Sequence, residues 1–288
     1  MKICVSTYSF GKYITKEGFG IFGAVDFAKE NGFDGIEIVD GMHENCSDFE
    51  LAKKVKRYCE EKGLEVASFC TTADFLFGSG EDLDAEIKRV CSKVDLAAAY
   101  GAKTFRHDVA YGYGNRHEYK FYENAIPRLA EGCRRVSEYA KEKGIVTTTE
   151  NHGFYSQDAL RVAALISAVN YENFGALVDI GNFMCADEEP EKSVAIVAPY
   201  AKMVHAKDFL FKPGYEMNPG EGWFKTRANN YLHGTVIGYG DAHASQSLSI
   251  LKKTGYDGYI SVEFEGLEDN LFGIRVGKDN VKRFWEIG

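Results

Sequence analysis

Four side chains of the kinds that bind metal ions stand at the ends of successive β-branched segments: Glu150, Asp179, His205 and Glu263. The first three are separated from one another by the length of about one strand and one helix. Three carboxylates and one imidazole form an oxygen-rich ligand set that suits Mn2+ or Mg2+, with Co2+ or Zn2+ as further choices. Because these groups would repel one another without a cation between them, the pattern predicts a site for one divalent ion, with Mn2+ preferred.

A single carboxylate at a strand end is more typical of a helix cap or a surface residue, so only the fourfold repetition favours a metal site. Glu265 is an alternative fourth ligand, because the two-residue period of a strand places it on the same face as Glu263. Glu263 is preferred, since Glu265 lies past the expected end of the strand.

Two further charged residues, on the second expected strand and at the end of the seventh, could face the same end of the barrel. Lys207 shares the parity of His205, so it could reach a substrate oxygen, although a salt bridge to Asp208 explains it equally well. Glu37, on the second expected strand, could orient a ligand or a substrate, or it could be a polar residue of the core.

Three further residues are candidates for contacts with substrate. His107 ends the fourth expected strand and His152 lies beside Glu150, so either could bind a hydroxyl group or serve a structural role. Arg227 lies in a long segment that could close over a polyhydroxy or phosphorylated substrate, for which a planar guanidinium is a suitable donor.

The elements that hold these side chains alternate between short strands and longer helices. Strands are expected over 3–7, 35–39, 65–70, 103–107, 145–149, 175–179, 202–206 and 259–264. Helices are expected near 19–31, 48–62, 82–100, 119–142, 156–169, 190–199, 243–254 and 270–287. Eight units in strict alternation predict a parallel sheet with right-handed crossovers, and eight strands close an α/β fold of the (β/α)8 TIM-barrel type.

The chain is expected to form a single TIM-barrel domain over residues 1–288, with a long loop after the seventh strand. That loop, 209–236, contains Pro213 and Pro219 and few periodic apolar positions, so it is expected to lack regular structure and to act as a lid or a binding loop. An open doubly wound sheet is the alternative architecture. It would normally carry a glycine-rich turn after the first strand, which this sequence lacks.

Composition excludes several other classes of protein. The 288 residues carry a formal net charge of -9, which argues against a protein that binds nucleic-acid backbones. No apolar stretch is long enough to span a membrane, and the N-terminal residues do not resemble a signal peptide. The seven cysteines are scattered and form no C-x-x-C pair, so a reduced, cytoplasmic protein is expected.

Five segments resemble the xylose-isomerase-like TIM-barrel superfamily, within it the sugar-phosphate isomerase and epimerase group that includes ketose 3-epimerases and inosose isomerases. They are ENHG (150–153), VDIGN (178–182), VHAKDF (204–209), GYGDAH (238–243) and GYISVE (258–263). The resemblance covers essentially the whole chain. It implies one divalent metal bound by Glu150, Asp179, His205 and Glu263, a small sugar or cyclitol as substrate, and possible homo-oligomers.

The resemblance also implies a mechanism. Glu150 and Glu263 would face opposite sides of a bound sugar, so that one removes a proton next to the carbonyl and the other returns it through an enediolate. A lyase on the same scaffold is the alternative, either a keto-inositol dehydratase or an enzyme that eliminates an aglycone from a 3-keto-glycoside. A non-catalytic sugar-binding barrel is a third reading, and metal-dependent cleavage of nucleic acid is disfavoured by charge and by the few histidines.

One position departs from part of the superfamily. Some epimerases and the related DNA-repair endonucleases carry a histidine three residues after the aspartate of the sixth strand, where this chain has Asn182. Asn182 therefore weakens any transfer of substrate identity from the ketose epimerases.

Overall fold

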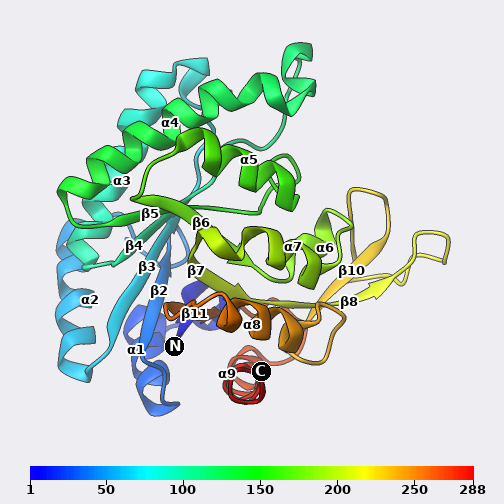
Figure 1. Ribbon diagram of the computed structural model, residues 1–288. Helices are drawn as coiled ribbons and strands as arrows, with labels where there is room; N and C mark the ends of the chain where they lie inside the picture. Colours follow the sequence, from blue (N-terminus) through cyan, green and yellow to red (C-terminus); the bar gives the residue numbers. More distant parts are fainter.

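The computed structural model describes residues 1–288, and eight parallel strands close into a barrel (Figure 1). The barrel strands are β1 (Lys2–Ser6), β2 (Gly35–Val39), β3 (Glu65–Thr71), β4 (Thr104–His107), β5 (Val146–Glu150), β6 (Phe174–Asp179), β7 (Ala201–Ala206) and β11 (Tyr259–Val262). Each strand pairs with its neighbours in chain order, and β11 pairs with β1 to close the ring. The expected (β/α)8 barrel is therefore confirmed.

Helices surround the barrel and connect its strands. They are α1 (Gly20–Glu30), α2 (Phe49–Lys62), α3 (Leu83–Tyr100), α4 (Tyr122–Glu142), α5 (Ala159–Val169), α6 (Asn182–Cys185), α7 (Pro190–Val197), α8 (Ala244–Lys253) and α9 (Asn270–Ile287). None of them combines the length and the apolar character needed to cross a membrane. The expected strands and helices all exist, and their ends differ from the expected ones by only a few residues.

The helix ends follow from local chemistry. Asp48, Asp82 and Asp158 each cap a helix by accepting a hydrogen bond from a backbone N–H of its first turn. Gly63 and Gly101 end α2 and α3 in the left-handed conformation that glycine adopts without steric cost. After each of these helix ends, the next strand begins within very few residues.

The barrel has two separate apolar regions. A large cluster of 70 buried residues fills the space between the strands and the helices. A second cluster consists of five buried residues from four strands of the barrel: Cys4, Ala67, Cys70, Leu177 and Met203. Leu177 has the parity of Asp179 on β6, and Met203 has the parity of His205 on β7, so this face changes from apolar to ionisable toward the carboxyl ends of both strands.

The long segment after β7 is not the irregular loop that the sequence predicted. It forms a three-stranded antiparallel sheet of β8 (Asp208–Lys212), β9 (Phe224–Lys225) and β10 (Tyr231–Thr235), with β10 in the middle. Figure 1 shows this sheet, which we call the β8–β10 arm, projecting from the barrel beyond β7. Its strands show no regular alternation of exposed and buried residues, and the prolines and glycines of the segment favour a loop, so these strands are hard to recognise from the sequence.

Asp208 anchors the arm to the barrel. Its carboxylate accepts backbone N–H bonds from Phe209, Gly238, Gly240 and Ala242 at 2.7–3.1 Å. A Cβ at Gly240 would clash with this carboxylate and with the carbonyl of Phe209, so the position requires glycine. The seven cysteines are all free, and six of them are buried, in agreement with the expected absence of disulfides.

Candidate metal centre

Four side chains converge at the carboxyl end of the barrel, where TIM barrels place their active sites. Glu150 ends β5, Asp179 ends β6, His205 lies in β7 and Glu263 directly follows β11. Each offers one ligand atom, and these four atoms lie within 4.8 Å of one another. The structure thus brings together all four residues that the sequence predicted as metal ligands.

The imidazole of His205 is fixed in orientation by Glu37. Nε2 lies 2.9 and 3.0 Å from the two carboxylate oxygens of Glu37, which also accepts a hydrogen bond from Ser261. Because Nε2–H is used in this way, Nδ1 is the nitrogen available to a cation.

The donor set fits a divalent ion. Nδ1 of His205 and Oδ2 of Asp179 are both buried and make no hydrogen bond. Nδ1 lies 3.3 Å from Glu263 Oε2 and 3.7 Å from both Glu150 Oε1 and Asp179 Oδ2. Buried polar atoms left without a partner are costly, and a cation among them would satisfy both. Three oxygens and one nitrogen are a ligand set for Mn2+, Mg2+ or Zn2+.

The charges at the site perturb one another strongly. Burial raises the pKa of Asp179. At Glu150 burial also acts to raise the pKa, but the positive charge of Arg106 outweighs this effect, and the pKa is lowered. Burial disfavours a charge on His205, but the carboxylates of Glu263 and Glu37 outweigh it and hold the imidazole pKa well above its usual value. His205 and Lys207 likewise overcome burial at Glu263 and hold its pKa well below the usual range.

Lys207 reaches into the same cluster. Its Nζ lies 2.7 Å from Glu263 Oε2, 3.1 Å from Glu265 Oε2 and 3.3 Å from Asp179 Oδ2. The suggested salt bridge to Asp208 does not form, because Asp208 is occupied by backbone N–H groups. Glu265 contacts Lys207 but is not part of the group of four.

Asn182, the position that departs from some epimerases, is a structural link within the cluster. Its Nδ2 donates to Glu150 Oε1 and its backbone N–H donates to Asp179 Oδ1, both at 2.9 Å. Its Oδ1 lies 3.3 Å from Lys207 Nζ. Asn182 therefore connects two candidate ligands and the lysine through its side-chain amide and its backbone N–H, which fixes their relative positions.

The other predicted contacts fall in three different places. His107 is fully buried, and its ring packs against Phe75 and Phe174 with Nδ1 2.7 Å from the carbonyl of Asp108, so it faces the helix layer. His152 is partly exposed, with Nδ1 3.0 Å from Asp108 Oδ1. Arg227 pairs with Asp158 at 3.1 Å and donates to the carbonyl of Phe154, outside the group of four.

Sequence reasoning missed Arg106, the residue of β4 that does enter the site. Its Nη2 lies 2.5 Å from Glu150 Oε2 and 3.1 Å from Asp108 Oδ1. Arg106 and His107 are adjacent, so only one of them can point inward. Phe105 shares the outward parity of His107, but both faces of β4 are buried, so the sequence of the strand carries no signal that separates the two residues.

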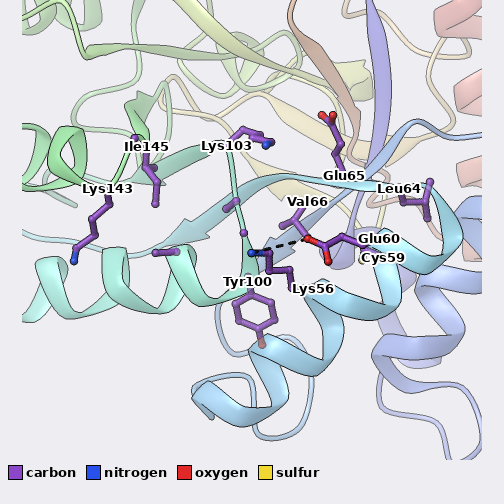
Figure 2. Close-up of a pocket in the computed structure, with 14 residues that line it drawn as sticks. Lys56, Cys59, Glu60, Leu64, Glu65, Val66, Tyr100, Lys103, Lys143 and Ile145 are labelled. Atoms are coloured by element: carbon purple, nitrogen blue, oxygen red, sulfur yellow. Dashed lines mark ion pairs between the residues drawn. The ribbon is translucent and has the colours of Figure 1, made fainter.

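A separate cavity lies at the opposite, amino-terminal end of the barrel strands (Figure 2). It measures about 380 Å3 and is lined by residues that precede or begin β3, β4 and β5. Figure 2 shows Lys56 paired with Glu60 at 3.9 Å, while Lys103 and Lys143 point in different directions. Its cations do not converge on one point, and the end of the barrel that carries chemistry is the other one.

Comparison with known proteins identifies the family. The model of the xylose isomerase-like TIM barrel matches residues 25–280, and the chain belongs to this family. No curated protein sequence matches the chain.

Three solved structures illustrate the shared fold. A D-tagatose 3-epimerase-like protein has a TM-score of 0.74 at 18% identity, covering 100% of this chain and 98% of that one. The IolI protein with a bound zinc atom has a TM-score of 0.74 at 16% identity, with coverages of 100% and 99%. The probable 3-DHS dehydratase AsbF from Bacillus anthracis has a TM-score of 0.73 at 19% identity, with coverages of 98% and 98%. At these identities the likeness establishes the fold.

Proposed function

We propose that this protein is a metal-dependent isomerase or epimerase of a sugar or cyclitol, which moves a proton on the carbon next to a carbonyl group. The observation that carries the proposal is the convergence of Glu150, Asp179, His205 and Glu263 within 4.8 Å at the carboxyl end of the barrel. Membership of the xylose isomerase-like family and similarity to an epimerase-like protein support it.

The four converging residues would hold one divalent ion, with Mn2+ preferred because three of the four donors are carboxylate oxygens. Such an ion would act as a Lewis acid that polarises the substrate carbonyl and lowers the cost of removing the neighbouring proton. The IolI protein, which shares this fold, binds a zinc atom, and this supports a metal ion in the present protein.

Two glutamates perform the proton transfer in this proposal. β5 and β11 are separated around the barrel by β6 and β7, so Glu150 and Glu263 approach the centre from two sides. Arg106 lowers the pKa of Glu150 and keeps it ionised, ready to accept a proton from one face of the substrate. Glu263 serves the other face, and the Lys207 ammonium 2.7 Å away stabilises negative charge that develops on the substrate oxygens.

The test is hydrogen exchange with solvent. The protein loaded with Mn2+ is incubated in D2O with free and phosphorylated ketoses, inososes and keto-glycosides, and each sugar is followed by NMR. Deuterium is expected at one carbon next to the carbonyl, and Glu150→Gln should abolish its uptake, as should Glu263→Gln. Turnover without deuterium uptake would contradict proton transfer and point to hydride transfer. Glu189→Gln, at an exposed surface position, is the matched control.

A lyase is the second candidate, favoured by the similarity to the probable dehydratase and by one feature of the site. His152 lies two residues from Glu150 and is partly exposed, and its bond to Asp108 overcomes burial and raises its pKa. A histidine in this position could protonate a leaving group after Glu150 removes the proton. Release of water or of an aglycone in the same NMR experiment would favour the lyase over the isomerase.

A further inference from the structure

A second cavity opens on the same end of the barrel as the candidate metal centre, and we call it the aromatic subsite. It measures about 500 Å3 and is formed by the β4–α4 connection, the β5–α5 connection and the arm. Its lining includes three exposed aromatic rings and three cations: Tyr111, Tyr113, Phe154, Lys120, Arg161 and Arg227. Exposed aromatic rings gathered in one concave place are typical of a binding surface.

The subsite is joined to the metal centre by Asp108. Tyr111 donates its hydroxyl hydrogen to Asp108 Oδ2 at 3.0 Å. The other oxygen of Asp108 lies 3.1 Å from Arg106 Nη2, and that nitrogen lies 2.5 Å from Glu150 Oε2. One carboxylate and one guanidinium therefore separate a wall of the subsite from the proposed catalytic base.

Phe154 occupies a backbone conformation that disfavours its side chain. Its φ is +65°, a left-handed value that is rare for bulky residues. The conformation is held at both ends, since the N–H donates to Gln157 Oε1 at 2.6 Å and the carbonyl accepts from Arg227 Nη2 at 2.5 Å. The ring is 45% exposed, so core packing does not explain why an aromatic residue stands here.

The rim of the subsite is positively charged. Asp158 pairs with both Arg161 and Arg227, at 3.4 and 3.1 Å, and Lys120 forms no ion pair. Three cations against one carboxylate leave an excess of positive charge. The two arginines also donate to the carbonyls of Tyr155 and Phe154, so their donors are already largely used by the protein. This arrangement suits a carboxylate or phenolate carried by a planar ring. It suits a phosphate less well, because a phosphate needs several free hydrogen-bond donors around it.

We infer that the aromatic subsite receives an acidic ring joined to the reacting sugar, so that the substrate is a glycoside of such a ring rather than a free monosaccharide. The inference rests on the proposed function. The flat apolar face of the ring stacks on Phe154 and Tyr111, and its carboxylate or phenolate faces Lys120. An aromatic acid and a sugar acid share this chemistry, because a uronic acid also presents an apolar face and a carboxylate.

Binding of simple glucosides tests the inference. Isothermal titration compares methyl, phenyl and 4-carboxyphenyl β-D-glucoside, a glucuronyl-glucose disaccharide and glucose 6-phosphate. The carboxyphenyl glucoside is expected to bind roughly tenfold more tightly than the methyl glucoside, with the phenyl glucoside between them. Tighter binding of the glucuronide than of the carboxyphenyl glucoside would identify the ring as a sugar acid. Equal binding of the methyl and aryl glucosides, or preference for glucose 6-phosphate, would overturn the inference.

Matched variants locate the binding. Phe154→Leu should weaken both aryl glucosides by roughly fivefold, while Phe272→Leu, at a ring equally exposed on α9, should not. Lys120→Gln should weaken only the carboxyphenyl glucoside, by roughly threefold, with the exposed Lys54→Gln as its control. Equal effects of the subsite and control variants would overturn the assignment.

A stability measurement separates ligand binding from folding. Phe154→Gly removes the ring and relieves the left-handed backbone, so its melting temperature should not fall below that of the wild type, although aryl glucoside binding weakens. A large fall in melting temperature would show that the ring serves folding and would overturn the binding role. In Glu150→Gln the preference for aryl glucosides should persist. If the wild type takes up no deuterium but prefers aryl glucosides, the proposed function is wrong and this inference stands. If it takes up deuterium but shows no aryl preference, this inference is wrong and the proposed function stands.

Discussion

Arg106 lies between two buried carboxylates, those of Glu150 and Asp108, and is itself almost completely buried. The carboxylate of Asp108 also forms hydrogen bonds with His152 and Tyr111. Removal of one member of a buried charge network leaves its partners without compensation, which costs far more than loss of an exposed pair. The network explains how a carboxylate can remain ionised at the base of an enclosed site.

Arg106→Met should lower the free energy of unfolding by about 3–5 kcal/mol, because Glu150 and Asp108 would be left buried without a counter-charge. Arg116→Met is the control, since Arg116 is 46% exposed although it also pairs with two carboxylates. Its effect should stay below about 1 kcal/mol. Urea denaturation of the two variants measures both values, and equal losses would refute the role of burial in this network.

His107 makes a different kind of contribution, through the pH dependence of stability. Burial lowers its pKa to about 4, from 6.5 in an exposed histidine. The unfolded chain therefore binds a proton between pH 6.5 and 4 that the folded protein does not bind. The stabilising contribution is present above pH 6.5 and is lost as the pH falls through this window.

We expect His107→Gln to reduce the loss of stability between pH 7 and pH 5 by about 2 kcal/mol relative to the wild type. His117→Gln, at an exposed histidine, should leave the loss unchanged. Denaturant titrations at the two pH values give the comparison. If both variants follow the wild type, the histidine is not buried as a neutral ring.

The β8–β10 arm depends on one acidic side chain. Asp208→Asn keeps one acceptor oxygen where the carboxylate has two, so some of the N–H groups of Phe209, Gly238, Gly240 and Ala242 lose their partner. The variant should lose about 2–3 kcal/mol of stability, and hydrogen exchange should accelerate at Gly238 to Ala242.

Asp241→Asn is the control for the arm, since Asp241 accepts a single bond, from the exposed Phe211 N–H. Its effect should be about 0.5 kcal/mol. Unchanged hydrogen exchange in Asp208→Asn would show that the arm is held by its strand pairing instead.

For the helices and strands, the sequence predicts the elements of the barrel well and those of the β8–β10 arm poorly. Helical periodicity, short β-branched runs and glycines after the helices locate every strand of the barrel and all its helices except the short α6, because each signal is local. The segments Asp208–Lys212 and Tyr231–Thr235 show no regular alternation of polar and apolar residues, and their pairing depends on contacts across a long intervening stretch. Neither local propensity nor turn chemistry determines such a pairing.

Side-chain direction shows the same limit. The strands of a parallel barrel are buried on both faces, so β4 lacks the alternation of polar and apolar residues that would reveal which residues face inward. His107 was therefore chosen where Arg106 enters the site. Glu150, Asp179, His205 and Glu263 were predictable because four similar residues repeat at the same relative position on four strands.

For the molecule as a whole, the excess of acidic residues is partly local. Three of the carboxylates behind the net charge of -9 lie in the group of four, and Arg106 and Lys207 place positive charge beside them. The aromatic subsite on the same face carries the opposite sign at its rim. This combination suits a neutral sugar at the proposed metal centre and an acidic group at its edge.

The central claim is that these four side chains form one divalent metal site. Isothermal titration of chelator-treated protein with Mn2+ tests it most directly, with Asp179→Asn, Glu263→Gln and Glu265→Gln measured alongside. The wild type and Glu265→Gln should bind about one ion per chain, whereas Asp179→Asn and Glu263→Gln should lose roughly tenfold or more in affinity. Absence of saturable binding in the wild type, or equal binding in all four proteins, would contradict the account.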